Sequence, residues 1–368
     1  MRLFTSALLA TTILTAGTAT AKAEVDVVTS IKPVHSLVAA VMEGVGTPYL
    51  IIEGGGSPHT YALKPSQAAK LQDADVVFWI GHELEAFLEK PIEGIATKAK
   101  SVALIEAHGL NQIAFREGGA FDSHGHDGHD DHGHDDHGHE KKGHDDHGHD
   151  DHGHEKKGHG DHGHDDHGHE KKGHDDHGHD DHDHGKTDHD SHGHGGFDPH
   201  VWLDPVNAKA LVDEIEEVLS DADPAHAATY EANAARVTAR LDALVDDVQA
   251  ELEPVRGRGF IVFHDAYQHF ETRFGISAVG SITVSPEVMP GAERIRELQE
   301  KVRSLDATCV FSEPQFEPKL VATVIENTDA RTGVLDPLGA SIDKGPDSYF
   351  TLIRNMASAL KSCLSGTS

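Results

Sequence analysis

Cysteine, aromatic residues and basic side chains are all scarce in this chain of 368 residues. The two cysteines belong to no Cys-x-x-Cys pair, which argues against a zinc site built on thiolates. Lysine and arginine number 31 against 63 acidic residues, and no basic patch is visible, so a nucleic-acid binder is excluded. After residue 23, no run approaches the roughly 20 apolar residues that a membrane-spanning helix needs.

Histidine, by contrast, is abundant: most of the 33 histidines lie in one segment from Asp122 to His194. That segment holds 25 histidines, 23 acidic residues and 7 lysines, but no apolar side chain. It cannot bury enough area to offset the entropy of ordering, so we expect a disordered insertion over residues 122–196. Its imidazoles and carboxylates predict several loosely held metal ions, and a charged linker without a metal role is the alternative.

The first 23 residues have the pattern of a cleavable secretory signal, with Arg2, the apolar stretch Leu8–Ala16 and a small-residue cleavage motif. The alternative is a buried N-terminal helix. An exported, soluble protein is therefore expected. In an oxidising compartment Cys309 and Cys363 most simply pair, which would stabilise the fold by about 4 kcal/mol. A thiolate metal ligand is the alternative.

Short apolar runs alternate with amphipathic stretches outside the histidine-rich segment, which predicts α/β lobes with mostly parallel sheets. The predicted strands are Val25–Ile31, Tyr49–Ile52, Val76–Ile80, Val102–Ile105, Gly259–Phe263, Ala278–Ile282, Thr308–Phe311 and Thr332–Leu335. The predicted helices include Val34–Met42, Pro65–Leu71, Val206–Leu219, Pro290–Leu305, Pro318–Glu326 and Ser348–Leu364.

One further helix is unusually long. Apolar residues at three- and four-residue steps predict it from Asp223 to Glu251, with Asp223 as its N-cap and Pro254 ending it. We expect this helix (223–254) to join an N-terminal α/β lobe (24–222) to a C-terminal α/β lobe (255–368). The alternative is one helix within a larger single domain.

Four polar residues stand at predicted strand ends or just after the histidine-rich segment. His59 follows the strand at Tyr49–Ile52, His264 ends a strand, Asp336 ends another, and His200 follows the insertion. Ligands of open parallel sheets collect beyond the carboxyl ends of strands, so these side chains are candidate metal ligands. Three imidazoles and one carboxylate suit Zn²⁺. Of the remaining histidines, His82 also lies at a predicted strand end, and it is a weaker candidate.

Several motifs resemble the zinc-uptake periplasmic solute-binding proteins of the ZnuA type. The resemblance is carried by Ser57–Ser66, Asp198–Pro205, Phe263–Tyr267 and Leu335–Gly339, in the order of that family, and by Glu313–Phe316. It extends from about Val25 to the C-terminus. A histidine-rich insertion before the Asp198 motif is also typical of the family.

The resemblance implies two α/β lobes joined by one long helix, with zinc held between them by His59, His200 and His264. Some zinc-binding members have an acidic residue before the first histidine, but here it is Pro58. The fourth ligand is then Asp336, water or a histidine of the insertion. The resemblance also implies a Cys309–Cys363 disulfide, a periplasmic location and delivery of zinc to the membrane permease of an ABC transporter. We further expect a monomer.

Two other functions remain open. A manganese or iron carrier would share this architecture. A three-histidine zinc enzyme is the rival from another class, but the chain has no His-Glu-x-x-His motif and no nucleophile elbow. We also expect the long helix to keep the lobes nearly fixed, so that metal binding orders loops instead of rotating the lobes.

Overall fold

The computed structural model describes residues 25–116, 121, 196–283, 291–304, 308–316 and 319–366. The predicted signal sequence and the histidine-rich segment from Asp122 to His194 lie outside these residues, so both remain predictions. None of the helices in the described part is long and apolar enough to cross a membrane.

Two separate four-stranded sheets, each wholly parallel, form the framework. The first has the order β2-β1-β3-β4, with β1 Val27–Thr29, β2 Tyr49–Leu50, β3 Val76–Trp79 and β4 Lys100–Ala103. The second has the order β6-β5-β7-β8, with β5 Phe260–His264, β6 Ala278–Thr283, β7 Cys309–Ser312 and β8 Arg331–Val334. The predicted α/β class is confirmed.

All eight predicted strands are present, and each differs by one or two residues from its predicted bounds at one or both ends. Strand β4 is displaced by two residues toward the N-terminus: it begins at Lys100 and stops at Ala103. A 3₁₀ turn takes over at Leu104–Glu106, so the apolar residues Leu104 and Ile105 leave the sheet. The apolar pattern reflects burial, and buried residues continue from the strand into the turn. The pattern therefore does not mark the residue at which the strand ends.

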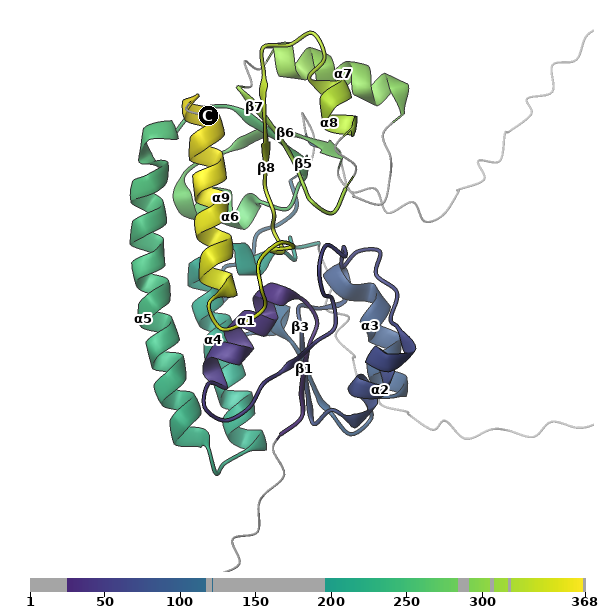
Figure 1. Cartoon of the computed structure of the whole chain (residues 1–368), viewed down its shortest axis with the longest axis vertical. Coiled ribbons are helices and arrows are strands. Elements are labelled where there is room, and N and C mark those ends of the chain that lie inside the picture. The colour runs from purple at the N-terminus through teal and green to yellow at the C-terminus, as the bar shows by residue number, and fades with distance from the viewer. Residues whose placement is uncertain are drawn as a thin grey trace, which may run out of the picture. The chain divides into compact units, whose positions relative to one another are not determined.

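The helices of the described part flank these sheets (Figure 1). They are α1 Lys32–Val41, α2 Pro65–Asp73, α3 His82–Gly94, α4 Pro205–Ala222, α5 Ala227–Leu252, α6 Gln268–Phe274, α7 Ala292–Ser304, α8 Lys319–Val324 and α9 Ser348–Ser365. Helices α3 and α6 were not predicted from the sequence. Non-helical backbone at Glu85 and the internal Pro91 interrupt α3, and α6 has only seven residues.

The long helix α5 starts four residues later than predicted. Asp223 is not its N-cap: it ends α4, where its N–H donates to the carbonyl of Leu219. The Asp223 carboxylate instead accepts hydrogen bonds from His226 Nδ1 at 2.5 Å and from the Tyr230 hydroxyl at 3.3 Å. An Asp-Pro pair is equally suited to a helix start and to the turn between two helices, and here it forms the turn.

Helix α5 is packed on several sides. Its 26 residues contact α1 and α4, which precede it, and α9 near the C-terminus, as Figure 1 shows for α4 and α9. One hydrophobic core runs through these helices and both sheets, from Val25 to Leu364. A second, smaller core lies among β5, β6, β7, α7 and α8. The residues on either side of the predicted lobe boundaries at 222 and 254 therefore share one continuous core. The division of the chain into two lobes at these residues remains a prediction.

The two cysteines form a disulfide, which confirms the predicted pairing. Cys309 in β7 and Cys363 in α9 are 54 residues apart and both are buried. The bond fastens the C-terminal helix to the second sheet. Because both sulfurs are used in it, neither is available as a thiolate ligand.

The buried His35 gives the fold a pH-dependent weakness. Burial lowers its pKa to about 4, although a hydrogen bond to the Pro48 carbonyl opposes the shift. Between about pH 6.5 and pH 4 the unfolded chain binds this proton and the folded chain does not, so stability falls as the pH falls. In urea titrations of the metal-free protein, the wild type should lose about 2 kcal/mol more between pH 7 and pH 5 than His35→Gln. Equal losses in the two proteins would mean that protonation of His35 does not cause the loss of stability.

Candidate metal centre

His59 lies on a glycine-rich loop after β2. The segment Gly54–Gly56 is followed by Ser57 and Pro58, and Gly54 has a φ of +70°, in the left-handed region that favours glycine. The His59 ring is half-buried. Of the three candidate histidines, only His264 lies within a strand, and His59 lies on a turn, seven residues after the last residue of the strand predicted before it.

His200 precedes the 3₁₀ turn Val201–Leu203. Its Nδ1 donates to the carboxylate of Asp198 at 2.7 Å, and its backbone N–H donates to the same oxygen at 3.0 Å. The fully buried Trp202 fixes this turn, because its Nε1 donates to the Pro337 carbonyl at 2.9 Å. His200 itself is 5 % exposed.

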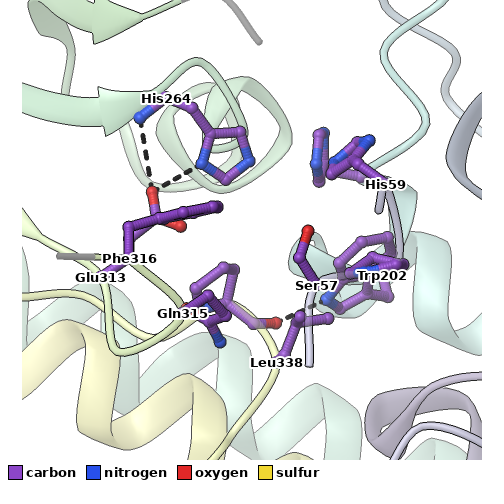
Figure 2. A pocket seen from close by; sticks show the side chains of 11 residues that line it. Ser57, His59, Trp202, His264, Glu313, Gln315, Phe316 and Leu338 are labelled. Carbon is purple, nitrogen blue, oxygen red and sulfur yellow. Dashed lines mark hydrogen bonds and ion pairs between the residues drawn. The ribbon is translucent and has the colours of Figure 1, made fainter. Parts of the chain in front are cut away.

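His264 is the last residue of β5, as the sequence analysis expected for a ligand at a strand end. Its Nδ1 donates to the Glu313 carboxylate at 2.6 Å, and Glu313 directly follows the neighbouring strand β7. Figure 2 shows this contact, with His59 facing His264 across the pocket. The Nε2 atom of His264 is buried without a hydrogen-bond partner in the described part of the chain.

The three imidazoles converge. One ring nitrogen from each of His59, His200 and His264 lies within 4.8 Å of the other two. The ring centroids are 5.3 Å apart for His200 and His264, and 5.6 Å and 5.9 Å from His59 to these two. They line one pocket together with Ser57, Trp202 and Phe316. A single divalent cation can therefore contact all three.

The electrostatics keep His59 neutral. Burial, together with the adjacent His200 and His264, lowers its pKa to about 2. Burial also acts to lower the pKa of His264, but the charge and hydrogen bond of Glu313 outweigh it and raise that pKa. Burial raises the pKa of Asp198 to about 6. A neutral imidazole is the form that binds a metal, so His59 is held in its ligating state.

Asp336 is not brought into this group. Its carboxylate accepts hydrogen bonds from Gln315 Nε2 at 3.1 Å and from the backbone N–H groups of Leu338, Gly339 and Ala340 at 2.6–3.2 Å. The loop is also held by Lys32, whose ammonium donates to the Ile342 carbonyl at 2.7 Å. The side chain thus organises the turn that follows it. As the structure stands, this candidate ligand faces its own loop.

No role was predicted from the sequence for Asp198 and Glu313, the carboxylates that hydrogen-bond two of the imidazoles. The sequence did carry a signal for each of them: an Asp-x-His spacing for Asp198, and an acid at the end of the strand beside β5 for Glu313. The weaker candidate His82 opens α3, is exposed and pairs with Glu89 at 3.0 Å. It does not approach the cluster in the described residues.

Comparisons with known proteins identify the family. The family model "Zinc-uptake complex component A periplasmic" matches residues 27–363. The high-affinity zinc uptake system protein ZnuA of Brucella suis is 54 % identical over 92 % of this chain and 91 % of its own length. The ZnuA protein of Paracoccus denitrificans is 39 % identical over 94 % of this chain and 93 % of its own length.

Solved structures share the fold. A crystal structure of ZnuA aligns with a TM-score of 0.63 at 20 % identity, covering 92 % of this chain and all of that one. The periplasmic zinc-binding protein TroA from Treponema pallidum aligns with a TM-score of 0.66 at 16 % identity, covering 93 % of this chain and 99 % of that one. The chain belongs to the family of periplasmic A components of zinc-uptake complexes.

Proposed function

We propose that this protein binds one Zn²⁺ through His59, His200 and His264 and delivers it to the membrane permease of an ABC-type zinc importer. The convergence of three ring nitrogens within 4.8 Å carries the proposal. The relatives that match most of the chain are named as zinc-uptake proteins, which supports zinc as the cargo. We place the mature protein in the periplasm as a monomer.

The chemistry of the donor set favours zinc over manganese. Imidazole nitrogens suit zinc-like ions, whereas manganese prefers oxygen-rich sites. Asp336 would have to give up its hydrogen bonds to Gln315 and to three backbone N–H groups before it could supply such an oxygen. We therefore propose water or a histidine of the insertion as the fourth ligand.

The site supports a carrier better than a zinc enzyme. A catalytic zinc also keeps an open position, but it needs a nearby general base. In the described part of the chain, the carboxylates that hydrogen-bond the cluster are Asp198 and Glu313. Each of them accepts a hydrogen bond from a histidine Nδ1, so each already serves to orient an imidazole. Hydrolase or hydratase activity of the zinc-loaded protein would favour the enzyme.

The histidine-rich segment is proposed to collect zinc for the site. It lies outside the described residues, but the chain on its two flanks is joined. Ala114 and Phe197 form an antiparallel bridge, and Phe115 N–H donates to the Gly196 carbonyl at 3.1 Å. The described flanks therefore lie side by side, and Gly196 is two residues before Asp198.

A competitive titration tests the proposal. The full chain, titrated with Zn²⁺ and Mn²⁺ against a chelating dye, should show one tight zinc site and several weaker ones. Deleting Asp122–His194 should remove the weaker sites and keep the tight one. A preference for Mn²⁺ would overturn the zinc assignment. Loss of the tight site on deletion would mean that the segment supplies an essential ligand.

A further inference from the structure

The three histidines are held very differently, and we propose that this sets the order of metal exchange. His200 and His264 form the rigid part of the site, because Asp198 and Glu313 hold their rings in position. His59 is the mobile ligand: it closes on the ion last and leaves it first. This inference rests on the proposed zinc function and adds to it the ligand through which zinc enters and leaves.

Asp198 locks His200 from several sides. The aspartate is fully buried, and its Oδ1 accepts both Nδ1–H and the backbone N–H of His200. Its own N–H donates to the Ile113 carbonyl at 2.8 Å, and its carbonyl accepts from His269 Nε2 at 3.0 Å. Rotating the His200 ring would therefore remove one of the two hydrogen bonds that this buried carboxylate accepts from His200, which is costly.

Glu313 does the same for His264. The carboxylate is 3 % exposed and bonds Nδ1 at 2.6 Å, while the backbone of His264 pairs with Thr283 of β6. With Nδ1 occupied, only Nε2 is left to meet a cation, and that atom is the buried one without a partner in the described structure. A carboxylate on the far nitrogen fixes the tautomer and orients a metal-binding imidazole.

His59 has no comparable support. No described residue hydrogen-bonds its ring, and the backbone from Gly54 to His59 makes one hydrogen bond in the described part, from Thr60 N–H to the Ser57 carbonyl at 3.4 Å. A side chain added at Gly54 would meet nothing within 4 Å, whereas one added at Gly56 would meet Ile52 and Tyr61 at 3.2 Å. Few backbone hydrogen bonds mark a segment that opens easily. The loop can withdraw His59 while His200 and His264 stay in place.

Hydrogen exchange of the full chain tests this order directly. Amide exchange is followed by mass spectrometry for the metal-free protein and for the protein with one equivalent of Zn²⁺. Peptides covering residues 50–62 should gain the largest protection on zinc binding. Peptides covering 197–206 and 259–266 should change little, because their hydrogen bonds already exist without metal. Equal protection of all three regions, or none in 50–62, would overturn the proposal.

Two conservative variants test the positioning roles of the carboxylates. Asp198→Asn and Glu313→Gln keep shape but weaken the acceptor, and each should lower zinc affinity by about 10–100-fold. Asp213→Asn and Glu217→Gln, on exposed positions of α4, are the matched controls and should not change it. Unchanged affinity in the first pair would refute positioning.

Proton NMR separates positioning from a merely structural role. In the zinc-bound wild type, ring N–H protons donated to buried carboxylates exchange slowly and remain visible. Each conservative variant should shift one of them. If a variant fails to fold, the exchange experiment on the wild type still decides. A wild type without a tight zinc site would refute the proposed function; a wild type that binds zinc with uniform protection would refute only this inference.

Discussion

Replacing His264 with alanine is expected to lower the zinc affinity of the tight site by more than about 100-fold. Loss of a carboxylate that only hydrogen-bonds a metal-binding histidine typically lowers affinity by about 10–100-fold, and loss of the histidine itself should cost more. The variant removes one of three converging imidazoles. It also leaves the Glu313 carboxylate, 3 % exposed, without its histidine. Competition with a chelating dye of known affinity measures the loss.

His82→Ala is the matched control for this experiment. His82 also follows a strand of the first sheet, but its ring is exposed and pairs with Glu89. Its removal should leave zinc affinity unchanged. If His264→Ala retained wild-type affinity, or if His82→Ala matched its loss, the three-histidine site would be wrong. Circular dichroism of both variants would show that the comparison is between folded proteins.

The second large effect is expected on stability. Arg116→Ala should lower the free energy of unfolding by about 3–5 kcal/mol, the usual cost of removing one partner from a buried ion pair. The Arg116 guanidinium contacts both oxygens of Asp265 and bonds both oxygens of Glu271, at 2.8 and 3.0 Å. These carboxylate side chains are 1 % and 4 % exposed. Without the arginine, two buried negative charges would lose the cation that pairs with both of them.

Arg354→Ala provides the comparison for Arg116. Arg354 pairs with Asp247 at 3.3 Å, and both side chains are about half exposed. Exposed pairs of this kind contribute about 0–1 kcal/mol. Urea unfolding of the two variants at neutral pH should therefore separate them clearly. Similar losses would mean that the Arg116 cluster is solvated well enough to tolerate a missing charge.

The strands and the position of His264 were predictable because both depend on local signals. A short apolar run gives a buried parallel strand, and a polar residue directly after it points to the edge where ligands collect. His264 obeys that rule in the structure. His59 lies seven residues beyond the end of the predicted strand, and the loop that returns it to the cluster could be inferred only from the family resemblance.

Asp336 shows where the strand-end rule fails. It stands just beyond β8, as a ligand would, but the chain turns back so that three backbone N–H groups meet its carboxylate. Whether an aspartate binds a metal or organises its own turn depends on the path of the next four residues. Asp198 and Glu313 were overlooked although their positions carried a signal, because the spacing alone does not show that a carboxylate hydrogen-bonds the histidine instead of binding the metal.

The continuous core has a kinetic consequence. Rotating one sheet against the other would shear the packing of α5 against α1, α4 and α9 and break the bond from Trp202 to Pro337. Such collective motions take microseconds to milliseconds, whereas short surface loops move within nanoseconds to microseconds. If only the segment bearing His59 has to move, the protein can sample its surroundings for free ions far faster than a binding protein that closes around its cargo by a hinge.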